Sequence, residues 1–149
     1  MKAVALLLVL GLAGACDLVP RFGGAWVHDT ALELGDVGGT TMRLVLGQYG
    51  PEVAGHLVLT ELTTCPCVYV KGTIEGDTVR FEPVDTTGCT PFFKRGEFDL
   101  SSDILRGTLS KLLSPGTDLA PLTAQPFELA REREQTDLGA DDLRGCEGE

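Results

Sequence analysis

Three stretches decide the fold of this 149-residue chain: Val53-Ala54-Gly55-His56-Leu57, Val70-Lys71-Gly72-Thr73-Ile74 and Leu105-Arg106-Gly107-Thr108-Leu109. Each stretch places a glycine between two apolar residues that share one face of an extended strand. A glycine that points inward relieves crowding where a sheet coils, and strands bend around a small barrel in this way. The three stretches therefore predict strands of a closed sheet.

The same period of two continues on both sides of these stretches. It predicts eight strands, one near Trp26 and the others around residues 42–46, 53–60, 68–74, 79–82, 97–100, 105–110 and 127–129. Short turns at residues 48–51, 75–77 and 101–103 join neighbours in antiparallel fashion. We therefore predict an all-β fold over residues 24–131, a single antiparallel up-and-down eight-stranded β-barrel, with a β-sandwich as the alternative.

The start of the first predicted strand carries a family resemblance. Gly24-Ala25-Trp26 resembles the G-x-W that opens the first strand of lipocalins and of related small barrels, including avidin-like proteins and bacterial metalloprotease inhibitors. In those families the tryptophan plugs one end of the barrel, and an arginine of the closing strand stacks on it. The resemblance implies that Trp26 and Arg131 form such a plug, with Arg133 as the substitute for Arg131. The chain has no counterpart of the lipocalin T-D-Y motif.

The N-terminus has the parts of an export signal. Lys2 supplies the positive charge, and the apolar run of residues 3–12 covers about 15 Å of helix, half of a hydrocarbon core. Residues 1–15 are therefore predicted to be a cleaved signal peptide. Leu12-Ala13-Gly14-Ala15-Cys16 resembles the lipobox of bacterial lipoproteins, which implies lipidation of Cys16 and a tether over residues 16–23. An ordinary secretory cut at the same bond is the alternative, because residues 13–15 also fit the A-x-A rule.

The cysteine count supports lipidation. Five cysteines are an odd number for an exported protein, and lipidating Cys16 leaves an even set, Cys65, Cys67, Cys89 and Cys146. The register of the hairpin around residues 75–77 places Cys89 nearest Cys65 or Cys67, and the other member of that pair is left for Cys146. Of these two connectivities we favour Cys65–Cys89 with Cys67–Cys146. A metal site at Cys65-Pro66-Cys67 is not expected, because no further ligands lie nearby in the sequence.

The charge balance excludes one class of partner. Without Lys2 the chain carries 11 basic and 22 acidic side chains, a formal charge of about −11, so nucleic acid is not an expected partner. Residues 132–149 are predicted to form a polar acidic tail, solvated or loosely helical. His56 falls on the polar face of its predicted strand, so its side chain is expected to be exposed.

No catalytic constellation stands out. His28-Asp29 has no partnered nucleophile, and neither G-x-S-x-G nor H-E-x-x-H occurs. We expect no enzyme activity, no catalytic residue, no cofactor and no metal. The expected function is that of a lipoprotein of the bacterial cell envelope, anchored to a membrane and facing the periplasm or exterior, which binds a small apolar ligand. The alternative is a protein-interaction module, such as a periplasmic protease inhibitor or an envelope assembly accessory. Residues 112–126, the longest connection, would either close one mouth of the barrel or pack under it.

Overall fold

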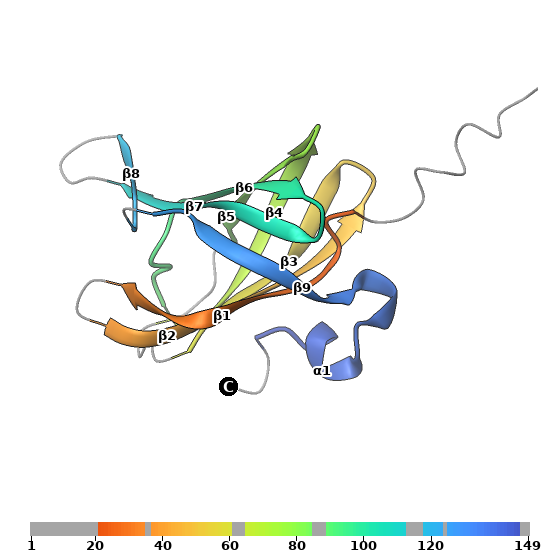
Figure 1. Ribbon diagram of the computed structural model, residues 1–149, viewed down its shortest axis with the longest axis horizontal. Coiled ribbons are helices and arrows are strands. Elements are labelled where there is room, and N and C mark those ends of the chain that lie inside the picture. Colours follow the sequence, from red (N-terminus) through yellow and green to blue (C-terminus); the bar gives the residue numbers. More distant parts are fainter. Residues whose placement is uncertain are drawn as a thin grey trace, which may run out of the picture.

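The computed structural model describes residues 21–34, 37–60, 65–84, 89–112, 118–123 and 125–146; the side chains of residues 29–40 and 141 are not among what it describes. The predicted signal peptide and the predicted lipidation site Cys16 lie outside these residues. The strands are β1 (Gly24–Leu34), β2 (Val37–Tyr49), β3 (Glu52–Leu59), β4 (Cys67–Glu75), β5 (Thr78–Pro83), β6 (Arg95–Ser101), β7 (Ile104–Leu112), β8 (Leu119–Pro121) and β9 (Phe127–Glu134). A 3-10 turn (Gln135–Asp137) and the short helix α1 (Ala140–Leu143) follow (Figure 1).

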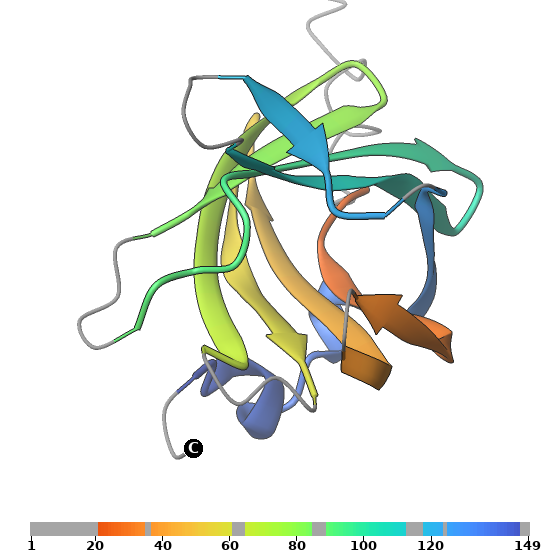
Figure 2. The same cartoon turned by 90° about the vertical axis from the view of Figure 1, so that its left-hand side faces the viewer.

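The strands form a closed antiparallel barrel of eight positions, which confirms the predicted fold class. Each strand from β1 to β7 pairs with the next one, and β9 closes the ring by pairing with both β7 and β1 (Figure 2). β8 and β9 follow the same edge of β7, because Leu112 pairs with Leu119 and Ile104 pairs with Ala130. The two segments therefore share the eighth position, in which β8 ends at Pro121 and β9 begins at Phe127.

The inward glycines permit close approach of neighbouring strands. A Cβ atom at Gly72 would lie only 1.9 Å from the carbonyl oxygen of Arg80 on β5. Gly55 and Gly107 meet a backbone oxygen of the adjacent strand in the same way. A side chain at these positions would push the strands apart, so the glycines allow the tight coiling that closes a small barrel.

Apolar side chains fill the interior of the barrel. A single cluster of buried residues extends from Phe22 at one end to Phe93 at the other. In its centre, Phe81 stacks on Phe98 with 5.8 Å between ring centroids, and the edge of Phe93 meets Phe81 at 6.1 Å. Burial of this face is the main favourable contribution to folding, at about 25 cal/mol per Å² of apolar surface.

The two ends of the barrel differ. The three tight turns, at residues 50–51, 76–77 and 102–103, lie at the end where the chain enters at Arg21, and we call it the turn end. The other ends of these strands lie at the opposite end of the barrel, which we call the loop end (Figure 1). Arg21 is held at the turn end by an ion pair with Asp77 of 2.6 Å.

Candidate functional site

The predicted plug residues lie together at the turn end. Trp26 is fully buried, and its indole N–H donates a hydrogen bond to the carbonyl of Phe22 at 3.0 Å. The guanidinium carbon of Arg131 lies 4.3 Å from the Trp26 ring centroid, close enough for a cation–π interaction. Arg131 also donates to the carbonyl of Gly23 at 2.8 Å and pairs with Asp103 at 3.1 Å. These contacts tie the entering segment and the β6–β7 turn to the closing strand, so their role is to close the barrel.

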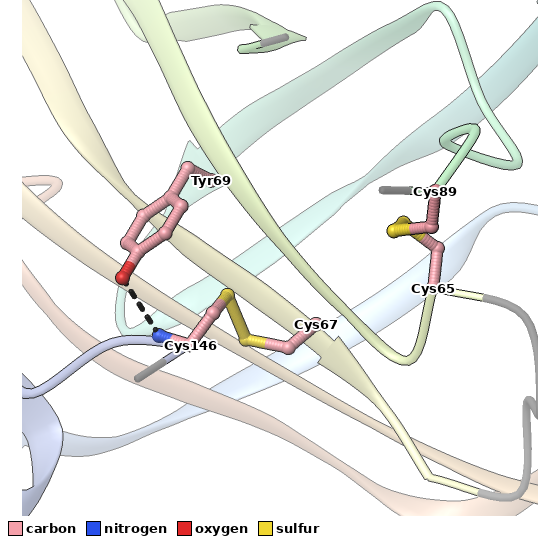
Figure 3. The surroundings of a disulfide bond; sticks show 5 residues. All are labelled: Cys65, Cys67, Tyr69, Cys89 and Cys146. Atoms are coloured by element: carbon pink, nitrogen blue, oxygen red, sulfur yellow. Dashed lines mark hydrogen bonds between the residues drawn. A yellow bond between two sulfur atoms is a disulfide. The ribbon is translucent and has the colours of Figure 1, made fainter. Parts of the chain in front are cut away.

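The four remaining cysteines form two disulfides. Cys65 pairs with Cys89, and Cys67 pairs with Cys146, with Cα–Cα distances of 5.4 and 5.5 Å (Figure 3). This is the connectivity that the sequence favoured. The first bridge holds the β3–β4 and β5–β6 connections together at the loop end. The second joins the start of β4 to the C-terminal residues, so those residues are fixed against the barrel.

Residues 135–146, which we call the C-terminal cap, lie over the outer face of the barrel. β9 continues to Glu134, three residues past the expected end of the barrel, and the cap then folds back instead of extending as a solvated tail. The cap is attached at its end as well, because the N–H of Cys146 donates to the hydroxyl of Tyr69 at 3.1 Å (Figure 3). The acidic composition predicted a solvated or loosely helical tail. Its described residues include a 3-10 turn and the short helix α1, and the disulfide and one buried carboxylate hold them on the barrel.

That carboxylate belongs to Asp142, whose side chain is only 4% exposed. It accepts hydrogen bonds from Arg43 at 2.6 Å, from Arg133 at 2.9 Å and from the N–H of Gly139 at 2.9 Å. Burial acts to raise the pKa of Asp142, but the Arg43 hydrogen bond, the Gly139 N–H and the two positive charges outweigh it, so the pKa is lowered. Burial likewise acts to lower the pKa of Arg43, and its bonds to Asp142 reverse the effect, so that pKa is raised. The pair is therefore charged in the folded protein and fixes the cap.

The expectation for His56 was wrong. Its residue is 5% exposed, although it lies on the outer face of β3. The alternation of β3 identifies that face correctly as the one turned away from the interior. The cap covers this part of the outer face, and strand alternation carries no information about such a cover.

An outer groove runs over the face of the barrel formed by β2 to β6, and sequence reasoning did not find it. Its first chamber, of about 740 Å³, lies over β3 to β6 between Tyr49 and Arg95. Its second chamber, of about 620 Å³, extends from Tyr49 beneath the cap to Leu143 and Gly145. Tyr49, Ala54 and Lys71 line both chambers, so the two form one continuous depression.

Small residues form part of the floor of the groove. Gly47 and Ala54 are opposite each other on β2 and β3, and both point outward. The ring of Tyr49 lies over Gly47, because a Cβ atom there would be 3.2 Å from two atoms of the ring. One face of the Tyr49 ring is thus supported, while the residue as a whole is 69% exposed. The signal for this floor in the sequence is the presence of small outward residues beside an aromatic one. The residues could not be placed from the sequence alone, because the register of β2 and β3 decides that Gly47 lies opposite Ala54.

Charged side chains line the first chamber as cross-strand pairs. Arg80 contacts Glu97 at 2.8 Å and Glu75 at 3.5 Å, and Arg95 lies 4.0 Å from Glu82. The hydrogen bond from Arg80 to Glu97 is the main reason that the pKa of Arg80 is raised. Such exposed pairs contribute little to stability, because water screens the charges. They do arrange positive and negative groups in fixed rows across the strands, which suits recognition of a partner by charge.

The described part of the chain holds no group of three or more His, Cys, Asp and Glu side chains placed to bind a metal. Among its helices, none combines the length and the apolar character needed to cross a membrane. Comparisons of the chain with protein-family models, with curated proteins and with solved structures found no match.

Proposed function

We propose that this chain is a non-catalytic protein-interaction module of the bacterial cell envelope, anchored by a lipid at Cys16 and binding its partner in the outer groove. The observation that carries the proposal is the contrast between the two faces of the sheet. Packed aromatic and aliphatic side chains fill the inner face, and the outer face offers two joined chambers of about 740 and 620 Å³. A concave surface that presents apolar and charged groups together can contact a protein partner through both.

A small apolar ligand inside the barrel, as lipocalins bind theirs, stays a prediction. This prediction is motivated by Gly24-Ala25-Trp26, because the G-x-W motif that it resembles occurs in families with such barrels. The filled interior argues against it, because a ligand would have to displace several of the side chains that stabilise the fold. The outer groove needs no such displacement.

The position of the entering chain supports the proposed arrangement on a membrane. Only four residues lie between Cys16 and Arg21, and five extended residue steps span roughly 17 Å. The turn end would therefore lie near the lipid, and the loop end would face away from it. Two or three acyl chains on Cys16 would be sufficient for stable attachment, since each buried methylene contributes about 0.8 kcal/mol.

The anchor is tested with Cys16→Ser. We expect the variant to move from the membrane fraction to the soluble periplasmic fraction, and mass spectrometry of the wild type to find an acylated N-terminal peptide. Persistent membrane association of the variant, or an unmodified N-terminal peptide in the wild type, would contradict lipidation.

The groove is tested by site-specific photocrosslinking in intact cells. A benzoylphenylalanine at Ala54, on the floor of the groove, is expected to give a discrete crosslinked product with a partner protein. The matched control places the same residue at Arg106, which is exposed on the outer face of β7 and lines none of the cavities described above. Crosslinks of equal yield and mass at both positions, or none at Ala54, would refute the assignment of the groove.

A further inference from the structure

Lys71 has a special place in the outer groove. It lies on β4 between the outward residues Ala54 and Glu82, and it lines both chambers. The other two cations of the groove, Arg80 and Arg95, have carboxylate partners. Within the part of the chain that the structure describes, no carboxylate lies within ion-pair distance of the Lys71 ammonium. A cation at the junction of the two chambers that has no such partner among the described residues is suited to an anionic group of a ligand.

Two large apolar side chains near Lys71 are exposed. Tyr49 is 69% and Leu143 is 72% exposed, and both line the second chamber together with Lys71. Tyr49 comes from the end of β2, whereas Leu143 comes from α1 in the cap, which the Cys67–Cys146 disulfide fixes to the barrel. An aromatic and an aliphatic side chain held in place from two elements can enclose an apolar group of a ligand at little entropic cost.

The floor of the groove offers no main-chain pairing. Strands β2, β3 and β4 are each paired with a neighbour on both sides. A ligand there cannot add itself as a further strand of the sheet, as peptides do at a free edge. A ligand in the groove must therefore be recognised through side chains, namely through the charge of Lys71 and through apolar contact.

We propose that the outer groove binds an extended peptide segment of a partner protein in which a carboxylate stands next to an aromatic or branched apolar side chain. The carboxylate pairs with Lys71, and the apolar side chain packs between Tyr49 and Leu143. The chain as a whole repels anions, with 22 acidic and 12 basic residues. The first chamber is lined by three cations and by three carboxylates, Glu52, Glu82 and Glu97. Two of those carboxylates pair with Arg80 and Arg95, so Lys71 is the cation left for an acidic segment. This inference rests on the proposed function, because it names the ligand of the same groove.

The test selects peptides directly. The full-length protein in detergent micelles is presented to a displayed library of random twelve-residue peptides, and enriched peptides are synthesised and their Kd measured by fluorescence polarisation. We expect enrichment of Asp or Glu beside Phe, Trp, Leu or Ile. Lys71→Met should weaken the Kd of these peptides about fivefold, as expected for loss of one exposed charge pair, and Lys71→Glu should weaken it further.

Controls separate the parts of the inference. Lys111→Met removes a lysine on β7 outside the groove and should leave the Kd unchanged. Tyr49→Ser and Leu143→Ser should weaken binding without altering its dependence on salt, since they remove apolar contact and not charge. Because all four side chains are exposed, circular dichroism should show unchanged folding.

The outcomes distinguish this inference from the function on which it rests. Peptides that bind equally well to wild type and to Lys71→Glu, or an enriched set with no acidic residue, would overturn the inference. If Ala54 crosslinks a partner while no peptide is enriched, the extended-segment ligand is wrong and the protein-interaction function stands. If the crosslink also fails, both are wrong.

Discussion

Removal of the Cys67–Cys146 disulfide, by replacing both cysteines with serine, should lower the free energy of unfolding more than removal of Cys65–Cys89. The first bridge joins residues 79 apart in sequence and the second joins residues 24 apart. In the chain-entropy description, a bridge stabilises by restricting the unfolded state, and the effect increases with loop length. It amounts to about 4.5 kcal/mol at 25 °C for the longer loop and about 3.4 kcal/mol for the shorter one. The expected difference between the two double variants is therefore about 1 kcal/mol.

Urea unfolding of the wild type and the two double-serine variants measures this difference. Replacing both partners avoids a free thiol, and fluorescence of the only tryptophan, buried Trp26, reports unfolding of the barrel. In thermal unfolding, a difference of about 1 kcal/mol corresponds to roughly 4 °C in Tm for a domain of this size. If the variant that lacks Cys65–Cys89 unfolds at the same or lower urea concentration, the loop-length argument does not hold for this protein.

The same pair of variants should differ locally. Without Cys67–Cys146 the cap is held mainly by Asp142, and its detachment would expose the His56 side chain, which is buried in the native protein. Faster modification of His56 by diethylpyrocarbonate is expected in that variant and not in the one lacking Cys65–Cys89. Equal protection of His56 in both variants would show that the disulfide is not needed to keep the cap in place.

Three further predictions concern the barrel and the cap. Gly72→Val should lower the free energy of unfolding by about 1–3 kcal/mol or more, because its Cβ atom would lie 1.9 Å from the Arg80 carbonyl oxygen. A urea midpoint equal to that of the wild type would contradict this close approach. Arg131→Met should cost about 3 kcal/mol through lost charge-assisted hydrogen bonds and the contact with Trp26, and should shift the tryptophan emission to longer wavelength; an unchanged emission would show that Arg131 does not shield the ring. The pKa of Asp142 lies below its ordinary value of 3.8, so its carboxylate stabilises the fold above about pH 3.8 and loses this effect as the pH falls through the lower folded value. The difference in unfolding free energy between wild type and Asp142→Asn should thus be constant near neutral pH and decrease only below about pH 4, and a decrease already at pH 6 would refute the assignment.

Much of the barrel could be predicted because each strand has one buried and one outer face. In β6, for example, Gly96, Phe98 and Leu100 alternate with charged residues, and the structure buries the first set and exposes the second. Short turns then fix which strands are neighbours, since a two-residue connection can only join adjacent antiparallel strands. These two local signals are sufficient to specify a simple succession of strands.

The burial of His56 and the groove could not be read from the same signals. Alternation tells which face of a strand is apolar, but it does not tell what covers the other face. The burial of His56 could have been inferred in one way, because Cys67 lies on the outer face of β4, next to the outer face of β3 that bears His56. The predicted Cys67–Cys146 bridge, combined with the β3–β4 register in which His56 is opposite Tyr69, places the C-terminal residues over this histidine. The β3–β4 register could not be read from the sequence, since it depends on contacts between the two strands and not on the sequence of either strand alone.

The separation of roles between the two faces of the sheet makes the proposed function testable without confusion between binding and folding. Residues that point inward, such as Phe81 and Leu57, are almost fully buried, so their replacement changes stability and any binding activity together. Tyr49 and Leu143 are mostly exposed, and their replacement removes little buried surface. A loss of partner binding in variants of these two residues, with unchanged urea midpoints, would therefore locate the activity on the outer face. The same loss accompanied by unfolding would instead point to a stabilising role for the residues of the groove.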